Sequence, residues 1–480
     1  MVRLSKSCVV GESMRHYDAY TAVKRFPTLK GYLEHFRKVS INNDVPGMLS
    51  FFFVQGMVAS PFVRIPMENN HLDPRVHVFW IQASRTGKSA AWEFVGDILR
   101  DIEVSAEMYT TGSDAGLIGG WEKNEDSNTW EVQEGLLAGH KALNFDEGSI
   151  LLSPGKFSQE TVLYLQSACN PIGSNANQLV KHNKMGPIKL ESLVSLWATT
   201  YPPKGVKDYV LTRGIFQRVL LYWKHWTLPM RKAISEERSC LAWADSTSTS
   251  VSYDELTSYF INLRKRLVSR ILKISGMNDA EWDDLNRSDK EDILQQHMRA
   301  MFTKSETFDI AMLNAVDNYY ELIESIDYEL GDVVASFIPA IVNYTIIFSC
   351  HIAMLDESWE VTGDHVEMAE DILYDLYNNL ITWLEEEVEV GSKAAEKRKK
   401  EGEWLQAYRD CEPVDFDDVR GDGWVRKTQM KNTYGKRTHV GKNAQESHFE
   451  KWCAHMFEQT KDGVTIFVRL QPEYRGEDYG

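Results

Sequence analysis

The chain has 480 residues, of which 43% are hydrophobic and 26% charged, and its formal net charge at pH 7 is −17. These proportions are ordinary for a globular protein of about two to four domains, and the negative charge argues against a protein that coats nucleic acid over its whole surface. The six cysteines are scattered without a CxxC pair, which argues against a disulfide scaffold or a zinc module and predicts a reducing compartment, the cytoplasm of a cell or of a host.

Residues 1–75 are predicted to be mostly helical. Residues 1–20 contain no apolar core of signal-peptide length, so we do not expect secretion. The apolar patch at 48–62, MLSFFFVQGMVASPF, is too short to span a membrane. We expect it to form a helix that packs on the following domain.

Residues 76–99, VHVFWIQASRTGKSAAWEFVGDIL, predict a buried strand, a polar loop and an amphipathic helix. The loop would offer backbone N–H groups and the positive end of the helix dipole to the phosphates of a nucleotide. Lys88 would reach the β- and γ-phosphates, and the Ser89 hydroxyl would bind Mg²⁺. The usual pattern has Gly at the position of Gln82, and a surface turn before an ordinary helix is the alternative interpretation. The expected nucleotide-binding residues are Gln82, Ala83, Ser84, Arg85, Thr86, Gly87, Lys88 and Ser89.

A second acidic site is expected at residues 141–147, KALNFDE, where an apolar strand ends in two carboxylates. Ligands bind at the carboxyl ends of strands in open α/β sheets. Asp146 would act on the Mg²⁺ through water, and Glu147 would polarise the attacking water as general base. Taken alone, an acidic pair that ends a strand in a turn explains the same residues.

A β-hairpin is predicted around Met185-Gly186, immediately before the next strand at 193–199. Lys181, His182 and Lys184 lie near its tip and suit contacts with the phosphate backbone of DNA, which are independent of sequence and sensitive to salt. The alternative is a solvated hairpin whose lysines only maintain solubility.

Two further polar residues have predicted roles in hydrolysis. Thr200, with Thr199 in reserve, ends the strand at 193–199 and would contact the γ-phosphate or the attacking water. Arg218 directly precedes the apolar strand at 219–223, and in a ring it would reach the nucleotide of the neighbouring subunit as an arginine finger. Arg213 is the alternative finger, and a surface salt bridge is the alternative role of Arg218.

The second half of the chain is predicted to be mainly helical. Residues 245–252 form a linker, residues 254–390 a helical region, and residues 392–403, SKAAEKRKKEGE, a charged tether. Residues 333–355 carry no formal charge and are long enough to span a bilayer, but Pro339, Asn343 and His351 and the lack of flanking basic residues favour a buried helix.

The C-terminal segment 404–480 has helical runs followed by the strand-like GVTIFVRL, which predicts a small winged-helix-like module. Trp424 and Tyr434 are interleaved with a local basic patch in this segment. A patch of this composition suits nucleic acid, although docking on the acidic helical region is the alternative. The patch consists of Arg426, Lys427, Lys431, Lys436, Arg437 and Lys442.

The order QASRTGKS, ALNFDE, a hairpin before LWATTYP and then GIFQRVLLY resembles the AAA+ ATPases with a pre-sensor-1 β-hairpin. These include the minichromosome-maintenance helicases and related virus- and plasmid-encoded replicative helicases. The resemblance extends over about residues 76–390 and includes a helical lid. Thr200-Tyr201-Pro202 stands where the family has Asn before Pro, and Gln217-Arg218-Val219 where it has a Ser-Arg-Phe-like element. Residues 1–75 lack the family's zinc-binding module and its oligonucleotide barrel.

This resemblance implies an α/β fold with four parts: an N-terminal helical region (1–75), a P-loop AAA+ parallel-sheet ATPase core (76–230), an α-helical lid bundle (254–390) and the winged-helix-like module (404–480). It implies a hexameric, ATP- and Mg²⁺-dependent helicase or translocase that acts in replication on single-stranded or forked DNA, with basic hairpins in a central pore and no membrane. The alternatives are a packaging or remodelling motor of the same fold, and a nucleotide-gated DNA-binding initiator with weak hydrolysis. The pair Asp146-Glu147 favours hydrolysis, because a site that only binds ATP needs no general base.

Overall fold

A computed structural model of the chain forms two compact units, Met1–Val388 and Glu389–Gly480. The first two predicted segments and all of the third (254–390) but its last two residues therefore lie in the first unit, and the predicted C-terminal module lies in the second. We describe each unit by itself. The structure describes residues 16–68, 70–109, 114–124, 128–146, 148–152, 159–182, 185–202, 206–207, 214–226, 230–232, 234–236, 249–324, 326, 328–389, 394–414, 416 and 423–471.

The first unit is built on a five-stranded sheet whose strands all run parallel. The spatial order is β12-β3-β10-β7-β4, so the third and fourth strands along the chain lie between the first and the second. This mixed α/β architecture agrees with the predicted fold class. The strands are β3 (Val78–Gln82), β4 (Ser105–Tyr109), β7 (Lys141–Phe145), β10 (Ser195–Thr200) and β12 (Leu220–Lys224).

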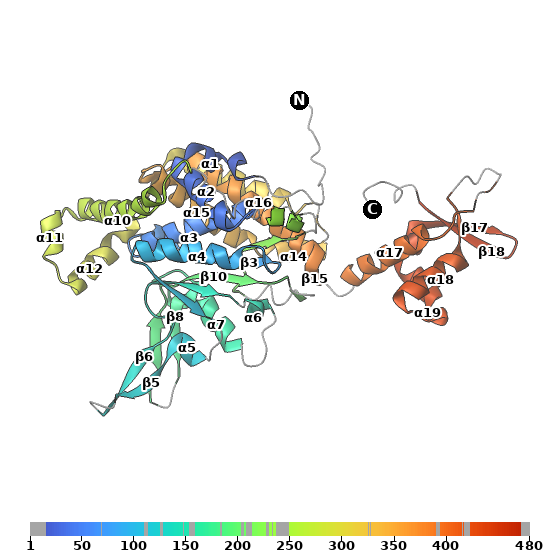
Figure 1. The fold of residues 1–480 in the computed structure, drawn as a ribbon, viewed down its shortest axis with the longest axis horizontal. Coiled ribbons are helices and arrows are strands. Elements are labelled where there is room, and N and C mark those ends of the chain that lie inside the picture. Colours follow the sequence, from blue (N-terminus) through green and yellow to red (C-terminus); the bar gives the residue numbers. More distant parts are fainter. Residues whose placement is uncertain are drawn as a thin grey trace. The chain divides into compact units, whose positions relative to one another are not determined.

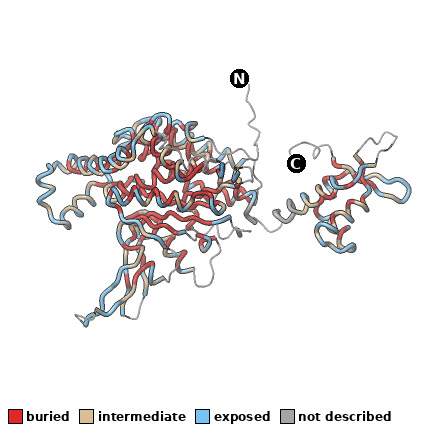
Figure 2. Tube along the Cα trace, in the orientation of Figure 1, coloured by how far each residue is buried: buried red, intermediate tan, exposed pale blue. Residues whose placement is uncertain are grey.

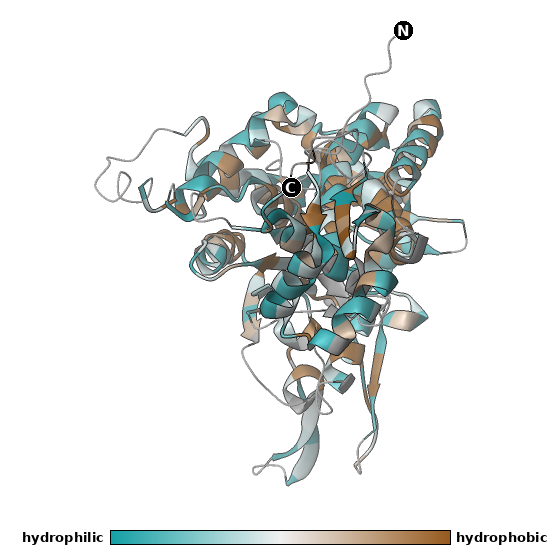
Figure 3. Ribbon diagram, turned by 90° about the vertical axis from the view of Figure 1, so that its right-hand side faces the viewer, coloured by the Kyte–Doolittle hydropathy of each residue, from teal (hydrophilic) through white to brown (hydrophobic). Residues whose placement is uncertain are grey.

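Both faces of this sheet are covered, which explains why β3 and β10 are buried at every position. On one face Trp80 lies 6.2 Å from Trp197, whose ring lies 5.5 Å from Phe53 of α3 (Asp44–Ala59), all between ring centroids. On the other face Phe79 lies 5.3 Å from Phe216. Hydrophobic residues gather on the central strands and on the helices packed against them (Figure 3).

The N-terminal helices pack directly on the sheet domain. Nearly every residue of α3 is buried, as expected for a helix that is apolar all round. It contacts α2, α4, α10 and α15, and Figure 1 shows α3 and α4 side by side above the sheet. The remaining helices of this region are α1 (Thr21–Arg25), α2 (Pro27–Val39) and α4 (Lys88–Asp101), with the short strands β1 (Ile65–Pro66) and β2 (His71–Leu72).

The predicted helical region after the sheet consists mainly of helices. Its first helix starts with a capping box between Ser252 and Glu255 and ends at Gly276, whose φ is 74°. The helices are α10 (Tyr253–Ser275), α11 (Asp279–Asp283), α12 (Arg287–His297), α13 (Glu306–Glu321), α14 (Tyr328–Ala335), α15 (Ile338–Leu355) and α16 (Gly363–Glu387), with β13 (Thr303–Lys304) and β14 (Glu360–Val361) forming a small parallel pair.

One stretch of the described residues, Leu330–Leu355, is long and apolar enough to cross a membrane by length and composition alone. Within the unit α15 packs against α16, α13 and α3. Gln55 of α3 donates a hydrogen bond to the carbonyl of His351 at 2.9 Å, and the His351 ring contacts the carbonyl of Pro74 at 2.8 Å. These contacts are those of a helix buried in a bundle.

Two antiparallel hairpins lie beside each other in the first unit (Figure 1). One is formed by β8 (Gln178–Lys181) and β9 (Ile188–Glu191), as the sequence predicts. The other, formed by β5 (Gly119–Asn124) and β6 (Thr129–Glu134), was not predicted. The nearby helices are α5 (Asp114–Ile118), α6 (Ser149–Leu152) and α7 (Gln159–Ala168).

Among its described residues, the second unit contains three α-helices and a three-stranded antiparallel sheet of order β16-β18-β17. Its core is centred on Trp404, which stacks on Tyr434 with 3.8 Å between ring centroids. The predicted tether at 392–403 is wrong from Ala394 onward, because this run of Ala, Glu, Lys and Arg, all good helix formers, begins α17. The elements are α17 (Ala394–Arg409), β16 (Val425–Arg426), α18 (Lys427–Thr438), α19 (Lys442–Trp452), β17 (Phe457–Asp462) and β18 (Thr465–Leu470).

Candidate nucleotide site

The predicted phosphate loop lies between the carboxyl end of β3 and the first turn of α4. Gly87 has a φ of 99° and is the residue before the helix, and an added Cβ there would lie 2.8 Å from the Ser40 hydroxyl, so only glycine fits. Arg85 has a φ of 62°, a left-handed conformation that costs a non-glycine residue about 1 kcal/mol. Among the described residues, no side chain caps the start of α4, which leaves its first N–H groups available for an anion.

Gln82, the departure from the usual glycine pattern, is the last residue of β3 and has extended backbone, so the position does not require glycine. Its buried side chain accepts a hydrogen bond from Trp80 Nε1 at 2.6 Å and donates to Asn43 Oδ1 at 3.0 Å and to the Thr86 carbonyl at 3.3 Å. Gln82 therefore fixes the loop from within.

A short N-terminal segment supports the same loop from outside. Asn43 donates to the Thr86 carbonyl at 2.8 Å, and Ser40 donates to the Gly87 carbonyl at 3.1 Å. Lys224, at the end of β12, donates to the carbonyl of Asn42. Burial lowers the pKa of Lys224 to about 8, which nearby Asp44 partly opposes. The segment before α3 is thus part of the site, although no role was predicted for it from the sequence.

We predict that replacing Gln82 by the glycine of the usual pattern destabilises the protein. The substitution leaves the buried Trp80 Nε1–H and the side-chain oxygen Asn43 Oδ1 without their partner, so the free energy of unfolding should fall by about 2 to 4 kcal/mol in urea titrations. Gln133→Gly on the exposed strand β6 is the control and should cost about 1 kcal/mol or less. Equal losses in the two variants would contradict the role assigned to Gln82.

Lys88 is the first residue of α4, and its side chain folds back over the loop. Its Nζ donates to the carbonyls of Gln82 at 2.5 Å and Ala83 at 3.0 Å, and lies 4.6 Å from the ring centroid of Tyr201. The ammonium thus lies over the loop to which an incoming phosphate would bind. Ser89 is exposed beside it, as a hydroxyl that binds a metal ion must be.

Asp146 and the two threonines meet at the same edge of the sheet. The parallel register places β10 between β3 and β7, so the polar ends of all three strands are neighbours. Thr199 donates to Asp146 Oδ1 at 3.2 Å, and Asp146 is exposed. The Thr200 hydroxyl is buried and, within the described part of the chain, has no hydrogen-bond partner. Glu147 lies outside the described residues.

This arrangement suits Mg²⁺ held between a nucleotide and few protein groups. Within the described ranges, no group of three or more His, Cys, Asp or Glu side chains could hold a metal by itself. Mg²⁺ is commonly bound through one or two protein ligands, substrate phosphates and waters. Ser89 and Asp146 fit that requirement, and the ion would neutralise phosphate charge.

Arg218 lies at the opposite edge of the sheet, before the amino end of β12. A five-residue strand separates it from the loop, a distance of about 15 Å. Its Nε donates to Asn170 Oδ1 at 2.6 Å, its Nη1 donates to the Gly214 carbonyl, and burial lowers its pKa. The guanidinium borders a cavity of about 340 Å³. Arg218 therefore does not reach the loop of its own chain, as the sequence predicts, and Arg213 lies outside the described residues.

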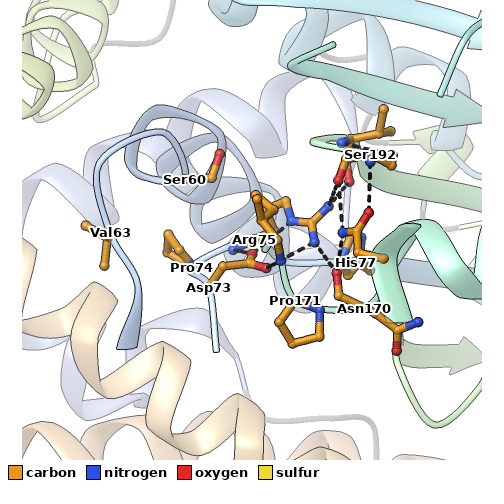
Figure 4. A network of polar contacts seen from close by, with 12 residues as sticks. Ser60, Val63, Asp73, Pro74, Arg75, His77, Asn170, Pro171 and Ser192 are labelled. Carbon is orange, nitrogen blue, oxygen red and sulfur yellow. Dashed lines mark hydrogen bonds and ion pairs between the residues drawn. The ribbon is translucent and has the colours of Figure 1, made fainter. Parts of the chain in front are cut away.

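A buried network anchors this edge (Figure 4). Arg75 donates to both carboxylate oxygens of Asp73, at 2.8 and 3.0 Å, and to the carbonyls of Asn170 at 2.5 Å and Val194 at 2.8 Å. Burial alone would raise the pKa of Asp73, but the charge and hydrogen bonds of Arg75 hold it well below its usual range. Asn170 joins this network to Arg218, whose position is thereby fixed.

His77 gives this edge a predicted acid sensitivity. Its Nδ1 accepts from the Leu196 N–H at 3.1 Å, and burial, with a contribution from Arg75, lowers its pKa from 6.5 to about 3. Between these two pKa values the unfolded chain therefore binds more protons than the folded chain. The free energy of unfolding falls as the pH is lowered through this range. In urea titrations between pH 6.5 and about 4.5, His77→Gln should reduce this slope by about 1 kcal/mol per pH unit; an unchanged slope would contradict the assignment.

The predicted DNA-contacting residues lie on the β8–β9 hairpin. Lys181 ends β8 and is partly buried, and His182 follows it and is exposed. Lys184 lies outside the described residues. The hairpin turn contacts the neighbouring hairpin, because Trp121 Nε1 donates to the Gly186 carbonyl at 3.1 Å.

The C-terminal basic patch is smaller than the sequence suggests. Lys427 forms ion pairs with Glu446 at 2.8 Å and Glu450 at 3.0 Å, and Lys431 pairs with Glu446 at 2.5 Å. These acids lie on α19, which follows the patch in sequence and packs against it. Arg437 pairs with Asp410, Trp424 and Tyr434 are buried, and Arg426, Lys436 and Lys442 are exposed.

The chain was compared with known proteins by sequence. No protein-family model matches it, and no curated protein matches it significantly. The site is therefore interpreted from its own residues.

Proposed function

We propose that the protein is a ring-forming, ATP-dependent DNA helicase or translocase that hydrolyses ATP at the interfaces between subunits. The observation that carries this proposal is the meeting of the Lys88 loop, Thr200 and Asp146 at one edge of a parallel sheet. An anion-binding loop, a metal-binding carboxylate and an unpartnered hydroxyl together make a site for phosphoryl transfer.

Each group has a distinct role in this proposal. The N–H groups of the loop and Lys88 bind the phosphates, Ser89 and Asp146 hold Mg²⁺, and Glu147 takes a proton from the attacking water. Thr200 orients that water or the γ-phosphate. Because the Thr200 hydroxyl is buried without a partner, a bound ligand would satisfy it.

The finer fold assignment, a AAA+ core with a helical lid and a winged-helix-like module, belongs to the same proposal. It is supported by the strand order, in which β10 separates the loop strand β3 from the acidic strand β7, and by the hairpin that precedes β10. The order of three helices and three strands in the second unit is compatible with a winged helix.

The proposal is tested by measuring ATP hydrolysis of the full-length protein with and without single-stranded DNA, together with particle images in an ATP analogue. We expect turnover that single-stranded DNA stimulates, and rings with DNA in the pore. ATP binding without turnover would support a nucleotide-gated initiator instead. Turnover stimulated by duplex DNA without strand separation would support a packaging motor.

Charge removal at the basic hairpin gives a separate prediction. Lys181→Ala combined with Lys184→Ala should weaken DNA binding and lower the slope of log K against log salt by about one to two, because each lysine releases about one counterion from DNA. Anisotropy titrations at several salt concentrations measure this slope. Lys273→Ala on α10 is the exposed control. If the double variant keeps the slope of the wild type, the lysines of the hairpin do not contact DNA and only maintain solubility.

A further inference from the structure

The β5–β6 hairpin has two faces of opposite character. Because side chains alternate along a strand, the register places Trp121, Lys123, Trp130 and Val132 on one face, which we call the aromatic face. Glu122 and Glu131 lie directly opposite each other on the other face, the acidic face. Two like charges facing across a hairpin are unfavourable, so stability of the hairpin does not explain them.

The aromatic face is exposed. Trp130 is 48% and Val132 41% accessible, and every residue of β6 is exposed. Figure 2 shows strand β6 exposed along its length, in contrast to the buried strands of the central sheet. A half-exposed tryptophan beside an exposed valine is an unusual surface for a side chain that normally buries its ring.

This face carries one lysine beside Trp130 and one acid, Glu134, at its other end. Lys123 is the cross-strand partner of Trp130 and is exposed on the same face. The Trp121 indole bonds to the Gly186 carbonyl, which joins the aromatic face to the turn of the β8–β9 hairpin. Lys181 and His182 precede that turn. Aromatic rings among cations form the surface on which single strands bind, with bases stacked on rings and phosphates next to lysines.

We infer that the aromatic face of the β5–β6 hairpin stacks unpaired bases, so that the protein selects single-stranded nucleic acid, with Trp130 as the principal stacking residue. Bases in a duplex are already stacked on each other and offer no free face. The acidic face repels phosphates, so the strand approaches from the side of Lys123 and the β8–β9 turn. This inference rests on the proposed function and extends it to a hairpin outside the ATP site.

The test compares two labelled oligonucleotides of equal length, oligo-dT and a strand in which most bases are replaced by abasic sites, in anisotropy titrations of the full-length protein. Trp130→Ala should weaken binding of oligo-dT by about 5- to 100-fold and leave binding of the abasic strand within about twofold. Trp130→Phe should restore most of the loss, and the salt slope should not change, because no phosphate contact is removed.

Leu313→Ala, on an apolar side chain of α13 that is 67% exposed, is the matched control and should bind both strands like wild type. Equal binding of oligo-dT by wild type and Trp130→Ala overturns the inference and leaves the proposed function intact. Failure of the wild-type protein to bind either strand overturns both. If Trp130→Ala sediments differently from the wild type in the absence of DNA, the inference is overturned. The aromatic face would then be a contact between copies of the chain.

Discussion

Lys88→Ala should lower the kcat for ATP hydrolysis by about 100-fold or more, the loss typical for removing a group that stabilises charge in the transition state. In the structure Lys88 Nζ donates to the carbonyls of Gln82 and Ala83 and lies over the ring of Tyr201. Lys88 is only partly buried, so we expect the variant to fold. Steady-state phosphate release measures the effect, and thermal unfolding confirms that the protein is folded.

Arg100→Ala provides the control for Lys88. It removes a cation from the last turn of the same helix, α4, where the side chain is 70% exposed and pairs with Asp97. Its turnover should match that of the wild type. If Lys88→Ala and Arg100→Ala hydrolyse ATP equally well, the loop before α4 is not the phosphate site.

Arg218→Ala should lower kcat by about 1,000-fold or more while ATP still binds, because an arginine finger acts on the transition state and not on the ground state. Arg218 lies at the amino edge of the sheet, so it can serve only the nucleotide of a neighbouring subunit. Filter binding of labelled ATP separates affinity from turnover. A parallel loss of affinity would indicate that Arg218 acts through the fold, by way of Asn170.

Mixing the two variants tests whether the site is shared. A ring assembled from Lys88→Ala and Arg218→Ala subunits contains some interfaces with an intact loop on one side and an intact arginine on the other. We expect the mixture to regain part of the wild-type turnover that neither variant has alone. No recovery, in a mixture shown to form common oligomers, would contradict the assignment of Arg218 to a shared site.

The sequence predicted the elements whose signals are local. The strand before Lys88, the strand that ends at Asp146 and the hairpin before β10 all follow from apolar runs with polar residues at their ends, and each occurs where it was expected. The common edge also followed, because parallel strands bring their carboxyl ends together.

The sequence could not predict contacts that depend on how distant segments pack. Asn43 precedes a helix, where an Asn normally caps the first turn, but its side chain bonds to the phosphate loop instead. The patch around Lys427 looked free because its acidic partners on α19 follow it in sequence. The β5–β6 hairpin was missed because the alternation of Trp130, Glu131, Val132 and Gln133 is short and every residue of β6 is exposed, so no buried face marks the strand.

If Arg218 serves a shared site, its separation from the Lys88 loop by the length of β12 limits how copies of this chain can associate. If one edge of a subunit must meet the other edge of the next, two kinds of contact are possible: a two-fold dimer in which each copy gives its arginine to the other's loop, or a heterologous contact. Head-to-tail association then either closes into a cycle or continues as a helical filament, according to the rotation between successive subunits. The number of subunits is thus set by the shape of that contact and not by the chemistry of the site.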